Sequence, residues 1–323
     1  MGRLIVRRFL LVVLQLVGLS LVLFFLMYPR EGYQWVVLEY YPYFEIAPIS
    51  FNFQEFFSDY SHWLGNILRG DFGWSWSFQM PVVEIIGRRL PHTLRLLTVT
   101  LLIIYGVGVP LGVVGGKYPG SFRDRIVLMV TQIGSSFPSF TMSYILMIFL
   151  VFGVIFGIRW FPLSGSLPLG VYRENGLIQY ELARLRHVIL PALSLALVQL
   201  VIPVKYLRSG ILETIKLPFI TTARAKGVKK KDIFKRHIFK NSLPPIIATF
   251  PMQLIAIISG MIIVERVFVF PGIGQLIFLS FQMGDLAVVI VLTLMLVTTV
   301  LLLNIVADVL IMKLDPRVEF EKK

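Results

Sequence analysis

Long apolar segments constrain the fold of this chain more than any other feature of its sequence. Each is close to the roughly 20 residues that a helix needs to cross the hydrocarbon core of a bilayer. The segments are Phe9–Met27, about Thr93–Gly116, about Ile126–Phe152, about Val188–Ser209, Pro244–Val264 and about Ala287–Met312. Inside a membrane, only helices and closed barrels satisfy every backbone hydrogen bond. The pattern therefore predicts an all-α integral membrane protein with six transmembrane helices.

Composition and charge agree with a membrane protein and argue against a soluble domain. Of the 323 residues, 56% are hydrophobic and only 15% are charged, and the mean hydropathy is +0.79. The net charge of +13 could suggest binding to nucleic acid. However, the basic residues alternate with the apolar segments, and retention of basic loops on the cytoplasmic side explains this alternation better. We therefore expect a lipid bilayer around the chain and no nucleic acid partner.

The sequence lacks the residue patterns of metal sites and disulfide frameworks. Cysteine is absent, which excludes disulfides, thiol nucleophiles and cysteine-based metal sites. The histidines are His62, His92, His187 and His237, and their scattered positions do not have the spacing of metal ligands. We expect no metal site and no catalytic residue in this chain.

Lysine and arginine placement predicts that both termini lie in the cytoplasm. The N-terminus, the turn after the second segment, the long basic loop and the C-terminal tail are rich in basic residues, whereas the intervening loops are poorer per residue. Arg88 and Arg89 are exceptions on the predicted outside. The first apolar segment could be a secretory signal, but Tyr28-Pro29-Arg30 offers no small-residue cleavage site. We therefore expect a retained transmembrane helix.

These features divide the chain into successive regions. Residues 1–28 form an N-terminal transmembrane helix, and residues 29–91 form an external segment. That segment is rich in aromatic residues, which suit a membrane interface. They include Tyr33, Trp35, Tyr40, Tyr41, Trp63, Trp74 and Trp76. Residues 92–312 form the transmembrane core, and residues 313–323 form a cytoplasmic tail. The core contains a basic loop at 213–241, which the family resemblance described below implies is a coupling loop. Within the third apolar segment, GSSFPSF predicts a bend that either lines a pathway or serves packing.

The most basic run of the chain, Thr221–Asn241, predicts a helix, a tight turn and a second helix. Pro218 should end the preceding helix because proline lacks an N–H and clashes with the preceding turn. A short helix over Phe219–Lys226 then stops at Gly227, the usual left-handed residue after a helix. In the second helix, an apolar stripe has helical spacing. It consists of Ile233, Phe234, His237 and Ile238. Topology alone would explain the charge, but not the small residues at the turn.

Several motifs resemble one family of transport proteins. TARAKG, followed by RHIFKNSLPPII, resembles the coupling loop of the inner-membrane subunits of ATP-binding-cassette importers. Of the broad consensus of that loop, only Ala223 and Gly227 are kept, and the departures resemble those of the dipeptide and oligopeptide permease family. GDFGWSW, RLPHTL, FPGIGQL and the tail Asp315-Pro316-Arg317 also resemble sequences of this family. The resemblance extends over nearly the whole chain and implies a type I importer permease fold.

The resemblance also implies two sites. The residues expected to couple the chain to an ATPase are Thr222, Ala223, Arg224, Ala225, Lys226, Gly227, Ile233, Phe234, His237 and Asn241. Two glycine-punctuated aromatic loops are candidates for an external gate or receptor contact, with an interfacial aromatic belt as an equal alternative. Their residues are Gly73, Trp74, Phe270, Pro271, Gly272 and Gly274.

The expected function is the pore-forming permease of an ATP-driven, binding-protein-dependent importer in the cytoplasmic (inner) membrane. No G-x-x-x-x-G-K-[ST] phosphate loop occurs, so ATP and Mg²⁺ would be used by partner subunits. The family implies a second related permease, two ATP-binding subunits and an extracytoplasmic substrate-binding protein. Peptides are the expected substrate, with oligosaccharides or a nickel chelate as alternatives. A secondary transporter or channel is a distant alternative, because ionisable residues such as Glu265 and Asp308 lie near predicted helix ends rather than mid-membrane.

Overall fold

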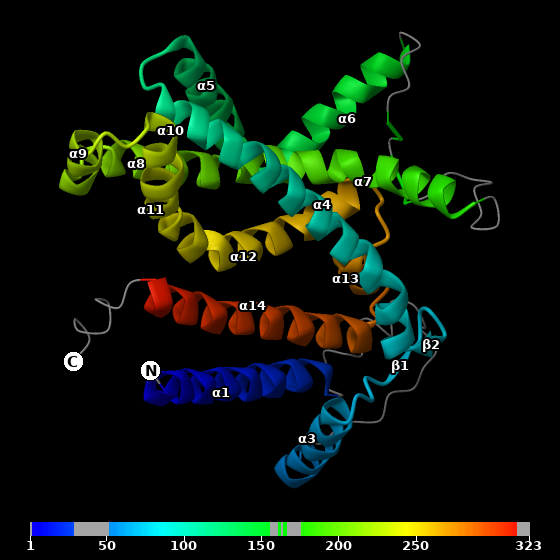
Figure 1. Cartoon of the computed structure of the whole chain (residues 1–323). Helices are drawn as coiled ribbons and strands as arrows, with labels where there is room; N and C mark the ends of the chain where they lie inside the picture. The colour runs from blue at the N-terminus through cyan, green and yellow to red at the C-terminus, as the bar shows by residue number, and fades with distance from the viewer. Residues whose placement is uncertain (1, 29–51, 156–160, 163, 167–175, 315–323) are drawn as a thin grey trace. The chain divides into compact units, whose positions relative to one another are not determined.

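The computed structural model describes residues 2–28, 52–155, 161, 162, 164–166 and 176–314. The expectations for Tyr33, Trp35, Tyr40 and Tyr41, and for the tail motif Asp315-Pro316-Arg317, lie outside these residues. The described part of the chain is almost entirely helical, as the apolar segments predicted. It forms two compact units (Figure 1), which we describe separately.

The first unit comprises residues 1–91 and 275–305. It contains α1 (Gly2–Met27), α3 (Phe53–Leu68), the short antiparallel hairpin of β1 (Trp74–Ser75) and β2 (Met80–Pro81), and the first turns of α4 (Val82–Lys117). It also contains most of α13 (Ile273–Gln282) and of α14 (Leu286–Leu314). Phe24 of α1 packs on Phe56 and Tyr60 of α3, and the Ser20 and Tyr60 hydroxyls are 2.8 Å apart.

The second unit comprises residues 92–274 and the chain after residue 305. It contains the rest of α4, and its other helices are α5 (Phe122–Ser136), α6 (Ser139–Ile155), α7 (Leu177–Gln199), α8 (Val201–Thr214), α9 (Pro218–Ala225), α10 (Lys230–Asp232), the π-helical segment η2 (Ile233–Phe239), α11 (Lys240–Ser242) and α12 (Pro244–Val267). Its main core packs α4, α7 and α12 together through fully buried residues such as Leu96, Leu195 and Ile257.

Close packing of α8 on α4 depends on glycine. A Cβ added to Gly112 would lie 2.9 Å from the Cβ of Leu207, and one added to Gly116 would lie 2.7 Å from the Cβ of Ile211. Either distance is too short for real Cβ atoms. The two helices therefore approach closely along a row of small residues, an arrangement that is common between helices in membranes.

The third predicted apolar segment is not one bent helix but two. Within the described residues, five helices are long and apolar enough to cross a membrane, and α5 with α6 would make a sixth. The α5 and α6 axes differ by 106° across the break at Phe137-Pro138, so the bend predicted from GSSFPSF is much sharper than a kink. A proline disfavours helical conformation of the residue before it, and Phe137 accordingly adopts extended backbone at φ −124° and ψ 138°.

Two helix starts and one predicted loop differ from the sequence-based expectation. The helix predicted from about Thr93 begins at Val82, and the one predicted from about Val188 begins at Leu177. The loop predicted over Glu265–Leu286 contains α13. In α4 and α7, turns that contain charged and polar residues extend an apolar helix, and hydropathy alone does not detect such turns. The helix α13 is apolar but only 10 residues long, too short to be predicted as a membrane span. The predicted start at Pro244 is confirmed.

Candidate functional site

The predicted turn at Gly227 is a regular helix end. The helix α9 begins with Pro218 at its first position, as expected for a residue without an N–H. At its other end, Gly227 N–H donates to the Arg224 carbonyl at 3.0 Å, and Val228 N–H donates to the Ala223 carbonyl at 3.2 Å. These two bonds define a Schellman motif, with Gly227 at φ +72°. The sequence pattern had predicted both the helix and its end.

The second helix of the predicted pair is a continuous helical run with a π-helical centre. It starts with α10, continues through η2 and ends with α11. In η2, Ile233 and Ile238 are 3% and 5% exposed, because they pack in one core with Leu207, Ile211 and Ile220. The apolar stripe therefore packs inside this chain, and it is not the surface that a partner would meet.

The residues proposed for coupling fall into a buried group and an exposed group. They gather at one end of the second unit, where α8, α9, η2 and α11 contact one another (Figure 1). Ile233 is buried, and Ala223, Phe234 and His237 are half-buried. The exposed members are Thr222, Arg224, Ala225, Lys226, Gly227 and Asn241. The exposed part of α9 and its C-terminal turn thus form a small, basic surface, which we call the α9 surface.

A bidentate ion pair connects the helix before α9 to α5. Arg208 Nε lies 2.7 Å from Asp124 Oδ1, and Arg208 Nη2 lies 2.9 Å from Asp124 Oδ2. Asp124 is 2% exposed and also accepts a hydrogen bond from Gly120 N–H at 2.9 Å. Bidentate guanidinium–carboxylate pairs are both strong and geometrically specific. The pair therefore holds α8, which leads directly into α9, in one position against the start of α5.

In the first unit, the hairpin with the GDFGWSW motif is held by a buried carboxylate. Asp285 Oδ2 accepts hydrogen bonds from the Ser75 hydroxyl at 2.5 Å and from Ser77 N–H at 3.2 Å. Asp285 is 4% exposed and precedes the first residue of α14, where a carboxylate is favoured. Gly73 is exposed, Trp74 is 49% exposed and Trp76 is 84% exposed. The hairpin thus presents tryptophans outward from an anchored base.

In the second unit, the FPGIG loop surrounds another buried carboxylate. Glu265 is 0% exposed, and its Oε1 accepts a hydrogen bond from the Thr93 hydroxyl at 2.8 Å. Its Oε2 accepts one from Gly274 N–H at 2.7 Å, in the first turn of α13, and Ile273 N–H donates to Thr93 Oγ1 at 2.8 Å. Glu265 is therefore the capping carboxylate of α13, and Thr93 of α4 connects the carboxylate to the same turn.

The two glycines of this loop are required because a larger side chain would not fit at either position. A Cβ on Gly272 would lie 2.1 Å from Glu265 Oε1, and a Cβ on Gly274 would lie 2.4 Å from the Ile262 Cα. Phe270, Gly272 and Gly274 are all buried within the chain, and Pro271 is half-buried. These residues therefore shape the loop from within, whereas Val269 is 52% exposed.

Val269 has an unusual backbone conformation. It follows α12 with φ +49°, a region that β-branched residues rarely adopt. Val269 N–H donates to the Arg266 carbonyl, and Phe270 N–H donates to the Glu265 carbonyl at 2.8 Å. This is the hydrogen-bond pattern found after α9, with valine in the position where glycine is normal. The loop therefore contains local strain that its neighbours hold in place.

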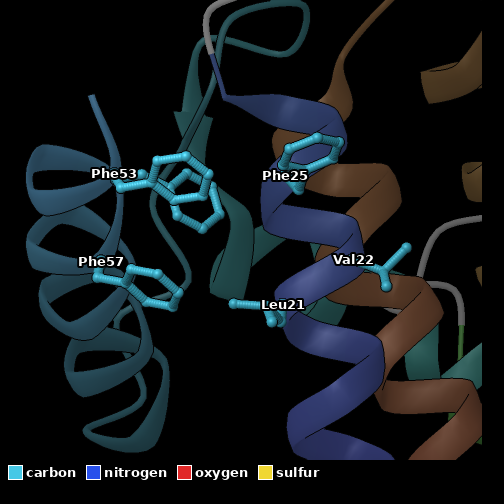
Figure 2. A pocket seen from close by; sticks show the side chains of 6 residues that line it. Leu21, Val22, Phe25, Phe53 and Phe57 are labelled. Atoms are coloured by element: carbon cyan, nitrogen blue, oxygen red, sulfur yellow. The ribbon is translucent and has the colours of Figure 1, made fainter. Parts of the chain in front are cut away.

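An apolar groove of about 210 Å³ lies between α1 and α3 in the first unit. Figure 2 shows Phe53 and Phe57 of α3 pointing toward α1, and Leu21 pointing back toward α3. The other lining residues are Val22, Phe25 and Phe56. Among the residues that the structure describes, the side chains lining this groove are all apolar.

Sequence reasoning missed the residues that anchor the GDFGWSW hairpin and the FPGIG loop. Glu265 was predicted only as a charge near a helix end, Asp285 was not singled out, and Thr93 was only the start of a predicted helix. The available signal was position, since Asp285 directly precedes an apolar helix as a capping residue does. Glu265 had no such signal, because Thr93 lies 172 residues away along the chain.

Comparisons with known proteins agree with this architecture. Residues 108–320 match the family described as "Binding-protein-dependent transport system inner membrane component". The chain is 35% identical over 262 residues to the oligopeptide transport system permease protein AppB of Bacillus subtilis (strain 168), a match that covers 81% of this chain and 80% of that protein. It is 32% identical over 259 residues to the putative peptide transport system permease protein BAB2_1050 of Brucella abortus (strain 2308), covering 80% of this chain and 79% of that one.

A solved structure has a similar fold. The MetNI methionine ABC transporter, in an inward facing conformation, superposes with a TM-score of 0.53 at 18% sequence identity. The match covers 72% of this chain and 96% of the matched chain. At this identity the similarity concerns the fold alone.

Proposed function

Because the chain belongs to the family of binding-protein-dependent transport system inner membrane components, we propose that it is the pore-forming permease of an ATP-driven importer of dipeptides or oligopeptides. The permease assignment rests on the family match and on the agreement of the fold with that of an ATP-binding-cassette importer. The peptide substrate is inferred from relatives that are named as peptide permeases.

The proposed partners follow from the same family. We place the chain in the cytoplasmic membrane with both termini in the cytoplasm, beside a second related permease. Two ATP-binding subunits would bind ATP and Mg²⁺, and an extracytoplasmic binding protein would deliver the substrate. The regions 1–28, 29–91, 92–312 and 313–323 keep the roles expected of them, with coupling assigned to residues 213–241.

Coupling would occur at the α9 surface. A groove on an ATP-binding subunit would grip α9, and the closure of the ATPase pair would move α9 as a unit with its Schellman turn. The core beneath α9 supports this role, because Ile220 and Ile233 are buried together and tie α9 to η2. The Arg208–Asp124 pair then connects the movement to α5. Rigid-body movement of packed elements is an established route from ligand closure to a distant conformational change.

The external loops would meet the binding protein. The exposed Trp74 and Trp76 of the hairpin are suited to this contact, because tryptophan buries a large surface at an interface. In the other loop, Val269 is the accessible position, while Phe270, Gly272 and Gly274 support the loop from within. We therefore propose that Trp74 and Val269 approach the binding protein during transport.

Reconstitution of the complete complex tests this proposal. The chain would be purified with the second permease, the ATPase subunits and the binding protein encoded beside it, and placed in lipid vesicles. We expect ATP-dependent accumulation of a labelled peptide, and crosslinking probes at Trp74 and Val269 that capture the binding protein. Accumulation of an oligosaccharide or nickel chelate instead of any peptide would refute the substrate assignment and leave the permease assignment intact. Transport without ATP or binding protein would refute the importer assignment.

A further inference from the structure

A proline interrupts the helical span that leads to α9. The span Ile178–Thr214 consists of α7 and α8, which meet at Leu200, and Pro203 lies in the first turn of α8. Proline has no N–H, so Pro203 cannot donate to the carbonyl four residues earlier, that of Gln199. A carbonyl without its helical donor is costly in a membrane, where water is scarce. The junction of α7 and α8 therefore needs a donor from another part of the chain.

Gln253 of α12 provides that donor. Its Nε2 donates to the Gln199 carbonyl at 2.8 Å, and its Oε1 accepts a hydrogen bond from the Tyr105 hydroxyl of α4. Gln253 is 1% exposed, so both bonds are inside the protein. One carboxamide thus links α4, the junction of α7 with α8, and α12.

The junction lies at the start of the helix that carries the α9 surface. From it, α8 extends 14 residues to Thr214, a length of about 21 Å at the rise of an α-helix. Along this length α8 packs closely on Gly112 and Gly116 of α4, and Arg208 pairs with Asp124. A displacement of α9 would therefore be carried by α8 to the junction, where the backbone has lost a regular helical bond.

We infer that Gln253 is a positioning residue for transport. Its carboxamide replaces the donor missing at Pro203 and keeps the junction aligned with α4 and α12. Movement of α9 then reaches these spans and is not absorbed by bending at the junction. This inference rests on the proposed role of α9 in coupling to the ATPase.

A rescue experiment tests the inference. Gln253→Leu removes both hydrogen bonds at similar volume, whereas Pro203→Ala restores an N–H that can donate to the Gln199 carbonyl. In the reconstituted complex, at equal amounts of assembled protein, Gln253→Leu should retain basal ATP hydrolysis. Its substrate-stimulated hydrolysis and peptide uptake should fall on the order of tenfold, because the Tyr105 hydroxyl and the Gln199 carbonyl both lose this buried partner.

The double variant decides whether the missing proline donor is the reason. Pro203→Ala also removes ring atoms near Gly108, so the double variant is compared with Pro203→Ala alone. The double variant should couple to within roughly twofold of Pro203→Ala, because the restored N–H makes the Gln253 donor unnecessary. If the two substitutions acted independently, the double variant would instead show the full loss seen in Gln253→Leu. Full coupling in Gln253→Leu, or a double variant no better than Gln253→Leu, would overturn the inference. If Gln253→Leu does not assemble, the double variant with Pro203→Ala should recover assembly, and failure to recover it would overturn the inference.

A measurement without transport separates this inference from the proposed function. The melting temperature of the purified chain in detergent would be compared for the wild type, each single variant and the double variant. Gln253→Leu should lower it in the wild-type background and by roughly half as much in the Pro203→Ala background. Equal decreases would refute the link between Gln253 and Pro203. Failure of the wild-type complex to import any peptide would refute the proposed substrate and leave this comparison intact.

Discussion

At the residue scale, two helix ends have the same hydrogen bonds but different residues. After α9 the left-handed position is Gly227, and after α12 it is Val269. A left-handed backbone costs an L-residue with a side chain about 1–2 kcal/mol, and glycine avoids that cost. The strain at Val269 lies in the loop that Glu265 and Thr93 anchor. The strained residue is therefore also the exposed position proposed for the receptor contact.

Replacement of the strained residue should stabilise the chain. Val269→Gly removes the left-handed cost, and the greater freedom of glycine in the unfolded chain offsets part of the gain. We expect a rise in melting temperature that corresponds to less than about 1 kcal/mol. Thermal unfolding in detergent measures it. Since Val269 is 52% exposed, little packing is lost, and a clear decrease in melting temperature would show that its side chain makes a needed contact.

At the other helix end, a side chain should disturb coupling without preventing folding. In the described part of the chain, nothing beyond its two chain neighbours lies within 4 Å of a Cβ built on Gly227, so the effect of Gly227→Val is expected from the left-handed backbone. The cost of about 1–2 kcal/mol should still permit insertion, while α9 and η2 change their relative orientation. We expect normal membrane levels but loss of ATPase copurification and of stimulated hydrolysis.

Gly227→Asn is the matched control for this substitution. Asparagine tolerates the left-handed region far better than valine does, so this variant should remain largely coupled. Wild-type coupling in Gly227→Val, or equal loss in both variants, would contradict the role assigned to the turn.

At the element scale, each of the two motif loops is anchored by a buried carboxylate that caps a helix. Asp285 caps α14 and holds the hairpin through Ser75, and Glu265 caps α13 and is held by Thr93. In both cases a buried carboxylate accepts hydrogen bonds from a hydroxyl and from backbone N–H groups. A buried charge without such donors is strongly disfavoured. The motifs GDFGWSW and FPGIG are therefore positioned by carboxylates outside them.

Loss of the Thr93 hydroxyl should loosen the second loop. Thr93→Val keeps the shape but removes the donor to Glu265 and the acceptor for Ile273 N–H. We expect a loss of about 1–3 kcal/mol in stability, the usual effect of leaving buried polar groups unpaired. Thermal unfolding and faster labelling of a cysteine placed at position 269 would report it. Thr93→Ser retains the hydroxyl and should behave as the wild type. If Thr93→Val also behaved as the wild type, the Thr93 hydroxyl would not anchor the loop.

At the scale of the whole molecule, the chain should depend on partners for energy. It contains no phosphate loop, and its family consists of transport components rather than ATPases. We expect the purified chain to show no ATP hydrolysis above background, and the assembled complex to hydrolyse ATP. A coupled-enzyme assay on both preparations checks this. Robust hydrolysis by the chain alone, free of any ATPase subunit, would refute the permease assignment.

Much of the architecture could be predicted because its signals are local. Apolar segments of membrane length identified the helical class and the approximate spans. Pro218, Gly227 and Pro244 located helix ends because proline and glycine restrict or release the backbone at their own positions. The family resemblance, carried by short motifs, is confirmed by the family match.

The remaining features depend on residues that are far apart in the sequence. The burial of Ile233 and Ile238 in η2 comes from packing against residues of α8 and α9. Glu265 meets Thr93 across 172 residues, and Tyr105 meets Gln253 across 148. Hydropathy and turn propensity describe a residue and its near neighbours, so they can place a helix in the chain. Which buried polar groups satisfy one another was decided only when the helices packed together.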